Sequence, residues 1–352
     1  MKKQGIWKKR ILPVLCAAVL LTGCADKKPQ EEPIDVDYLT EDFTAEEINA
    51  LSEVTNQLSV WSVYWDCAED IDTLREAHEE IAEVSLFAAY FKDGAVVIPD
   101  ATSRMLKKIR NKDTTREMQV YLSVVNDVET NGKTVQKDTD ILYELLGNED
   151  SAKAHAEALV SLAKENGYDG IEIDYEKIRS DLKLWQYFLH FEEVLLAAAE
   201  EADIGVRIVL ETSTPVSKLT FPEGAEYSVM CYNLYGNGTE PGPKADLDFL
   251  REIYEKFRDV PNISYAFSNG GFDWEENSRQ PAQVRTADAN ALAEKYGAEP
   301  VRDTDSGALY FSYTEKNKTH TVWYADADTL KAWAEEMNRL SGERAAISLW
   351  RM

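Results

Sequence analysis

The 352-residue chain has few histidines and few basic residues for its length. Its 64 acidic side chains outnumber its 38 lysines and arginines, which gives a formal net charge of −26. Nucleic-acid binding requires a basic face, so the composition argues against a nucleic-acid partner. The four histidines are scattered without the spacing of metal ligands, and no glycine-rich phosphate loop follows the first expected strand. We therefore expect no metal and no cofactor.

Cysteine is also scarce, with four residues in the chain. Cys16 lies in the apolar N-terminal segment, and Cys24 directly follows it. Cys67 and Cys231 lie near the first and sixth expected strands, which are not neighbours in a barrel. We expect these two to be buried free thiols, although an exported protein can form a disulfide.

An apolar run at residues 11–21 follows five lysines and arginines, which is the layout of a secretory signal peptide. The run is too short to span a bilayer as a mature helix. It ends in Leu21-Thr-Gly-Cys24, which resembles a bacterial lipobox. We expect residues 1–23 to be a signal peptide, Cys24 to be lipidated, and the protein to be anchored at the extracytoplasmic face of a bacterial membrane. A signal peptide with an incidental cysteine is the alternative. Residues 24–43 are acidic and contain prolines, which predicts a flexible tether.

From Leu58 onward, strand-like and helix-like segments alternate. The expected strands are Val60–Trp65, Val84–Phe91, Met118–Val125, Ile171–Glu176, Val206–Glu211, Tyr227–Tyr232, Ile263–Phe267 and Ala345–Trp350. The expected helices are Thr73–Ala82, Ser103–Ile109, Ser151–Glu165, Leu182–Glu201, Asp246–Phe257 and Thr329–Leu340. A capping box at Thr44–Glu47 predicts a short helix before them. Eight strands alternating with helices favour a closed (β/α)8 TIM barrel over an open doubly wound sheet.

One segment interrupts this alternation between the seventh and eighth strands. It runs from about residue 276 to 325, which is far longer than a βα connection requires. It contains a helix-like piece at Thr286–Tyr296 and two strand-like runs on either side of Glu315–Lys318, a hairpin pattern. We therefore expect one barrel domain over residues 44–352 with a small α+β insertion.

The segment Gly167–Lys177 carries acids at alternate positions. With the two-residue period of a strand, Glu172, Asp174 and Glu176 point to one face. Strands of βαβ units are usually buried on both faces, and carboxyl groups crowded on a buried face have raised pKa values. A carboxyl group that is still protonated near neutral pH is suited to general acid catalysis. The strand is therefore predicted to be catalytic rather than an ordinary solvated face.

Asp169, Glu172, Asp174 and Glu176 occupy the four acidic positions of a DxxDxDxE pattern, which resembles the signature of glycoside hydrolase family 18. That family comprises chitinases, endo-β-N-acetylglucosaminidases and related cell-wall glycosidases on (β/α)8 barrels, with the motif on the fourth strand. Glu172 departs from the pattern, because the family usually has Asp there. The resemblance implies retaining cleavage of β-1,4 linkages in glycans that contain N-acetylglucosamine, such as chitin-like or peptidoglycan strands.

The resemblance also implies a substrate-assisted mechanism, in which the 2-acetamido group of the sugar attacks its own anomeric carbon. Glu176 would protonate the glycosidic oxygen, and Asp174 would hold the acetamido N–H. Glu172 would share a proton with Asp174, and Asp169 would support the motif.

Two further strand ends resemble the family. Met230-Cys-Tyr-Asn233 is similar to Met-x-Tyr-Asp, so Tyr232 would bond the acetamido oxygen and Asn233 would replace the usual Asp. Trp350 ends the eighth strand, where the family places a tryptophan beneath the sugar. Further aromatic candidates for the substrate groove are Tyr64, Trp65, Tyr235 and Trp274.

Two alternatives to this function remain open at the level of sequence. One is an endo-β-N-acetylglucosaminidase that acts on the chitobiose core of N-glycans. The other is a non-catalytic carbohydrate-binding homologue, although binding members of the family have typically lost the final acid, which is Glu176 here. In each case the expected partner is an N-acetylglucosamine-containing glycan, and the protein is expected to be a monomer.

Overall fold

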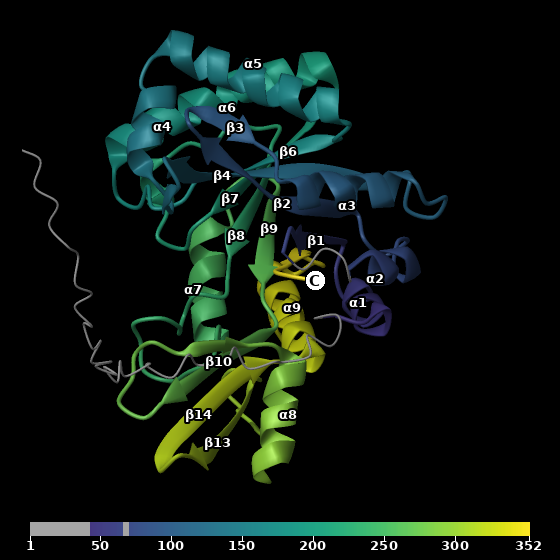
Figure 1. The fold of residues 1–352 in the computed structure, drawn as a ribbon, viewed down its shortest axis with the longest axis vertical. Coiled ribbons are helices and arrows are strands. Elements are labelled where there is room, and N and C mark those ends of the chain that lie inside the picture. The colour runs from purple at the N-terminus through teal and green to yellow at the C-terminus, as the bar shows by residue number, and fades with distance from the viewer. Residues whose placement is uncertain (1–42, 66–69) are drawn as a thin grey trace, which may run out of the picture. The chain divides into compact units, whose positions relative to one another are not determined.

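A computed structural model describes residues 43–65 and 70–352 (Figure 1). The expected signal peptide, the lipidation site at Cys24 and nearly all of the tether lie outside these ranges, as does Cys67. Cys231 is buried as a free thiol. Within the part of the chain that is described, no helix is both long enough and apolar enough to cross a membrane.

Eight parallel strands form a closed barrel. In chain order they are β1 (Gln57–Val63), β2 (Glu83–Lys92), β4 (Gln119–Thr130), β6 (Gly170–Asp174), β7 (Gly205–Leu210), β8 (Glu226–Met230), β9 (Ile263–Phe267) and β15 (Ala346–Leu349). Each strand pairs in parallel with the next one in this order, and β15 pairs with β1 to close the ring. The predicted (β/α)8 barrel is confirmed. Two short strands extend it as hairpins, β3 (Ala95–Val97) on β2 and β5 (Lys133–Val135) on β4.

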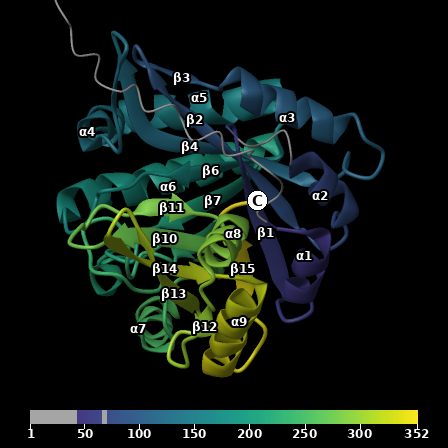
Figure 2. The ribbon, with the colours of Figure 1, turned by 60° about the horizontal axis from the view of Figure 1, so that its bottom comes forward.

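Helices surround the barrel strands (Figure 2). They are α1 (Ala45–Ser52), α2 (Asp70–Glu76), α3 (Asp100–Arg110), α4 (Thr139–Leu146), α5 (Glu149–Asn166), α6 (Leu182–Ala202), α7 (Leu247–Phe257) and α9 (Ala327–Ser341), with a short 3-10 turn at Val216–Lys218. The strand that carries the acids lies between α5 and α6. Helix α5 ends at Gly167, whose φ of 81° suits the left-handed C-cap that glycine favours. The chain then turns directly into β6.

A second, antiparallel sheet is inserted between β9 and β15. It contains β10 (Gly270–Glu275), β11 (Ala282–Val284), β12 (Val301–Arg302), β13 (Leu309–Glu315) and β14 (Lys318–Ala325), and α8 (Thr286–Tyr296) packs on it. The predicted hairpin turns at Lys316 and Asn317, which both have positive φ and so form the type I′ turn of two-residue hairpins. The inserted module has its own small apolar core, and its sheet begins at β10, before residue 276.

Candidate active site

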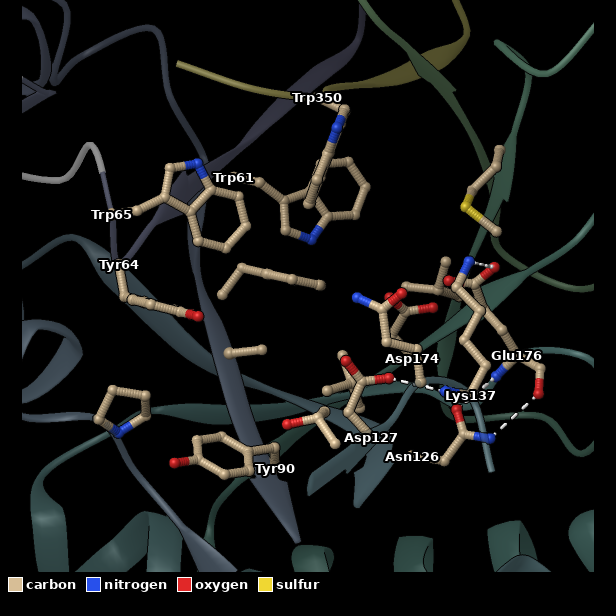
Figure 3. A pocket seen from close by; sticks show the side chains of 18 of the residues that line it. Trp61, Tyr64, Trp65, Tyr90, Asn126, Asp127, Lys137, Asp174, Glu176 and Trp350 are labelled. Carbon is tan, nitrogen blue, oxygen red and sulfur yellow. Dashed lines mark hydrogen bonds and ion pairs between the residues drawn. The ribbon is translucent and has the colours of Figure 1, made fainter. Parts of the chain in front are cut away.

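The acidic segment places Asp174 and Glu176 at the C-terminal end of the barrel, where active sites of this architecture lie. Strand β6 ends at Asp174, and Glu176 follows two residues later. Asn126, at the same end of β4, accepts a hydrogen bond from the backbone N–H of Glu176 at 2.9 Å and donates one to its carbonyl at 3.1 Å. This two-point contact fixes the backbone from which the Glu176 side chain projects (Figure 3).

A cavity of about 640 Å³ opens above these acids. Seven of the predicted site residues line it: Asp174, Glu176, Tyr232, Asn233, Trp350, Tyr64 and Trp65. Figure 3 shows the rings of Trp61, Trp65 and Trp350 across the cavity from Glu176. The Trp350 ring makes edge contacts with those of Trp61 and Phe87, at interplanar angles of 66° and 81° and centroid separations of 5.8 and 4.8 Å. The cavity therefore has an acidic wall opposite an aromatic wall, which suits a sugar with polar edges and apolar faces.

Four predicted residues do not line the cavity: Glu172, which is described below, and Trp274, Tyr235 and Asp169. Trp274 is 1% exposed and does not line the cavity, and its ring lies edge-on to that of Phe272 on the same strand, with centroids 5.5 Å apart. Tyr235 also lies outside the cavity lining, and its ring packs so closely on Gly242 that a Cβ there would come within 2.5 Å of it. Asp169 precedes β6 at the opposite end of the strand, where it contacts Arg110 and accepts the N–H of Val120 at 2.8 Å.

Glu176 forms an ion pair with Lys137. Burial raises the pKa of the Glu176 carboxyl above its ordinary value, and the Lys137 ammonium opposes this shift. Burial lowers the pKa of Lys137, but its attraction to Glu176 outweighs this and raises it overall. Glu176 is thus a carboxyl group whose protonation depends on where one lysine lies.

Asp174 and Tyr232 lie beside Glu176 in the same cavity. Burial raises the pKa of Asp174 well above its usual range, and repulsion from Glu176 and Glu172 adds to the effect. Its Oδ1 atom is buried and has no hydrogen-bond partner among the described residues. Burial, together with the charges of the nearby acids, also raises the pKa of Tyr232, so the phenol keeps its proton and can donate a hydrogen bond.

Glu172 lies deeper in the barrel and belongs to a different cluster. Its carboxylate accepts hydrogen bonds from Trp61 Nε1 at 2.5 Å, from Ser85 at 2.8 Å and from Ser123. Arg207, on β7, is fully buried and lies 3.4 Å from the same carboxylate. These partners occupy both oxygens of Glu172. The structure therefore provides no contact through which Glu172 shares a proton with Asp174.

The same arginine pairs with two more acids. Its Nη1 lies 2.8 Å from Glu83, and its Nε lies 3.3 Å from Glu226. The guanidinium also stacks over the ring of Trp61, with its carbon 4.6 Å from the ring centroid. Because Trp61 lines the cavity as well, this buried cluster supports one of the aromatic side chains that face the substrate space.

Lys137, Asn126 and Arg207 are absent from the sequence-based prediction. Lys137 reaches the site because β4 continues beyond Val125 and forms a hairpin with β5. That hairpin turns at Asn131-Gly132, which both have positive φ. An Asn-Gly pair between strand-like runs is a strong hairpin signal, so this extension was readable from the sequence. The pairing of Arg207 with Glu172 has no such local signal.

No family model matches the chain. It is 22% identical over 277 residues to the uncharacterized glycosylase YvbX of Bacillus subtilis, covering 74% of this chain and 78% of that protein. The Bacillus cereus spore cortex-lytic enzyme SleL superimposes with a TM-score of 0.69 at 16% identity, covering 89% of this chain and 82% of SleL. A class V chitinase from Nicotiana tobaccum, solved in complex with NAG4, gives a TM-score of 0.65 at 13% identity, with 84% of this chain and 94% of the chitinase covered.

At 13% and 16% identity, these solved structures show that the chain shares their barrel fold. The sequence similarity to a glycosylase independently supports a glycosidase. The cavity with carboxyl groups on one wall and aromatic rings on the other agrees with this class.

Proposed function

We propose that this protein is a family 18 glycoside hydrolase that cleaves β-1,4 linkages of N-acetylglucosamine-containing glycans with retention, by substrate-assisted catalysis. The observation that carries the proposal is the gathering of Glu176, Asp174 and Tyr232 around one cavity, opposite the ring of Trp350. The similarity to a glycosylase and to a chitinase solved with NAG4 supports a glycan of this kind.

In the proposed first step, Glu176 gives its proton to the glycosidic oxygen, and the bond from that oxygen to the anomeric carbon breaks. The acetamido oxygen of the same sugar forms the new bond to the anomeric carbon, giving an oxazolinium ion. Asp174 holds the acetamido N–H, and Tyr232 donates a hydrogen bond to the acetamido oxygen until it attacks. In the second step, Glu176 takes a proton from water, and the resulting nucleophile opens the ring with net retention.

A protein nucleophile is the competing mechanism, because Asp127 and Glu129 also line the cavity. Substrates without the 2-acetamido group distinguish the two. Under substrate assistance such substrates are inert, and a thiazoline analogue of the oxazolinium ion inhibits the enzyme. A trapped glycosyl adduct on Asp127, Glu129 or another carboxylate would end the assisted mechanism while leaving Glu176 as the acid.

The central test replaces Glu176 by Gln. Removing a general acid should lower the rate by about 10²–10⁴-fold or more, while glycan binding persists. Glu165→Gln, an exposed site on α5, is the matched control and should leave the rate unchanged. The assay should compare chitooligosaccharides, peptidoglycan strands and a glycoprotein, which separates chitinase-like and peptidoglycan activity from action on N-glycans. Ligand binding without turnover by the unaltered protein would indicate a carbohydrate-binding homologue.

We also propose that the protein is exported and lipid-anchored through Cys24. The Leu21-Thr-Gly-Cys24 sequence after a short apolar run supports this location. Radiolabelled palmitate should label the wild-type protein, and Cys24→Ala should abolish labelling. A mature wild-type protein that is free in the medium with an N-terminus other than Cys24 would contradict the proposal.

A further inference from the structure

The Lys137–Glu176 ion pair conflicts with the chemistry proposed for Glu176. A general acid must carry a proton when the glycosidic bond breaks, whereas an adjacent ammonium stabilises the ionised form. The pair occupies the cavity itself, since both side chains line it (Figure 3). In the free protein the Lys137 ammonium therefore opposes protonation of this acid, and separating the two groups would remove that opposition.

The structure leaves Lys137 free to move while its backbone stays fixed. The backbone N–H of Lys137 donates to Asp127 Oδ1 at 2.8 Å, and this residue has a φ of 56°. The lysine side chain is 40% exposed, whereas that of Glu176 is 14% exposed. A lysine ammonium is a mobile point charge on a flexible stem, so it can be drawn to another anion in the cavity.

The other groups around Glu176 favour its protonated form once the lysine leaves. Asp174 adjoins it on the same segment, Asp127 faces it from β4, and Glu211 faces it from the end of β7. Tyr232, beyond β8, is a neutral donor. The other nearby cation, Lys177, directs its ammonium to the carbonyl of Gln136 at 3.1 Å.

We propose that Lys137 is a positioning residue that responds to substrate. A carboxylate on the sugar, next to the scissile oxygen, draws the Lys137 ammonium away from Glu176, and Glu176 can then take up the proton that it needs as a general acid. This inference rests on the proposed function. As Lys137 moves, Glu176 takes up one proton from solvent, and that proton is later delivered to the leaving oxygen. The lysine charge is then neutralised by the substrate carboxylate.

The geometry of the linkage indicates which glycan meets this requirement. Because Lys137 contacts the carboxyl that protonates the leaving oxygen, it lies on the side of the leaving sugar. In peptidoglycan strands that sugar is bonded through O4 to N-acetylglucosamine and carries a lactyl ether on the adjacent O3. Where the stem peptide has been removed, the lactyl carboxylate is free and lies next to the scissile oxygen. Chitin has only a hydroxyl group there, which cannot replace the carboxylate of Glu176 as the partner of an ammonium.

The test compares glycans that differ in this carboxylate. The substrates are peptide-free peptidoglycan strands with free lactyl carboxylates, the same strands with these groups converted to amides, strands that keep their stem peptides, and chitooligosaccharides of equal length. The variants are Lys137→Met and, as a matched control on the same hairpin, Lys133→Met, which removes an exposed lysine outside the cavity. Initial rates should be measured from pH 4 to 9.

The wild-type protein should favour the free-carboxylate strands over their amides by roughly tenfold in kcat/KM, the equivalent of one pKa unit at Glu176. Lys137→Met should abolish this preference, raise the rate on chitooligosaccharides at neutral pH, and move the alkaline limb of their pH profile upward by about one unit. Lys133→Met should behave as wild type. A Lys137-dependent preference confined to strands with stem peptides would support the same device with the peptide carboxylates as the source.

The results separate failure of this inference from failure of the proposed function. If the wild-type protein hydrolyses none of these glycans, the proposed function fails and the inference fails with it. If hydrolysis occurs and requires Glu176, but Lys137→Met retains the carboxylate preference and the wild-type pH profile, the inference alone is overturned. An equal loss on all four substrates with an unmoved pH profile would assign Lys137 a purely structural role and also overturn it.

Discussion

Two cation–carboxylate clusters lie along the same wall of the barrel and are built differently. The deeper one holds Glu172, Glu83 and Glu226 around the fully buried Arg207. The upper one is a single pair, Lys137 with Glu176, at the cavity. A guanidinium is planar, permanently charged and able to bind several carboxylates at fixed angles, whereas an ammonium on a flexible chain can leave. The deeper cluster is therefore suited to fixing the positions of its side chains, whereas the upper pair is suited to forming and separating.

Asp174 lies between these clusters along the strand and contacts neither cation in the structure. Its carboxyl group is buried, and its pKa is raised accordingly. The acids of this segment thus progress from one surrounded by fixed donors, through one whose pKa is raised by burial, to one paired with a lysine at the cavity. The three acids at alternate positions have three different environments because different side chains surround each of them. The consequences can be tested by removing each partner in turn.

The largest effect is expected from Arg207→Met, which leaves the buried Glu83 and Glu172 and the partly buried Glu226 without a cation. Breaking a buried ion pair from one side costs about 3–5 kcal/mol of stability. Burial already raises the pKa of Glu83 to about 7 even with Arg207 present. Without the arginine, the folded state favours the protonated form of Glu83 more strongly. The loss of stability relative to wild type should therefore grow as the pH rises from 5 to 8. Urea unfolding at both pH values measures it.

Arg251→Met is the control for that experiment, because Arg251 is a half-exposed arginine on α7 that pairs with Asp248. Exposed pairs contribute about 0–1 kcal/mol, so the control should remain near wild type at both pH values. If the two variants lose equal stability, Arg207 is not the buried support that its contacts indicate.

The sequence predicts the barrel and the acidic strand because both depend on local periodicity. The ranges Ile263–Phe267 and Thr286–Tyr296 agree with β9 and α8 residue for residue, since alternation and helical spacing are properties of a short window. The alternating acids after Gly167 likewise follow from the strand period alone. Helix α2 is the poorest match, ending at Glu76 where the pattern predicted Ala82.

The partners of the acids could not be predicted from local periodicity. Arg207 is 124 residues from Glu83 in sequence, and they meet only because the closed barrel brings β2 and β7 to a common interior. Trp274 is of a residue type that stacks on sugars, yet its ring is buried and does not line the cavity. Side-chain type indicates what a residue can do, whereas long-range strand pairing decides which residues it meets.

A smaller effect, of the opposite sign, is expected at Glu192 on α6. This carboxyl group is fully buried with no cation; it accepts a hydrogen bond from Tyr227 at 3.0 Å, and burial raises its pKa to about 8. A folded-state pKa above the unfolded value of about 4.3 means that stability is full at low pH and falls as the pH rises from about 4.3 to 8. Glu192→Gln should remove this loss and raise stability at pH 8 by about 2–4 kcal/mol.

Denaturation curves at pH 5 and pH 8 measure this difference, which should be nearly absent at pH 5. This variant tests what the cation contributes, because Glu192 is a buried acid without a cation among the described residues, whereas Glu172 lies beside Arg207. A variant that is less stable than wild type at pH 8 would contradict this prediction and would indicate that the fold stabilises the charged form of Glu192.

The smallest effect on stability is expected from Lys137→Met, although this variant should change the pH profile of catalysis most clearly. The lysine is partly exposed, and pairs with solvent access contribute about 1 kcal/mol or less. When Lys137 is removed, Glu176 can take up a proton, and this limits the loss of stability that an unpaired acid at the cavity would cause. Arg207→Met instead leaves the buried Glu83 and Glu172 without their cation. At pH 7 the free energy of unfolding of Lys137→Met should therefore lie within about 1 kcal/mol of the wild-type value and well above that of Arg207→Met. Equal losses in the two variants would mean that the upper pair is as rigid as the lower cluster, and a fixed Lys137 could not release Glu176 to protonate the leaving oxygen.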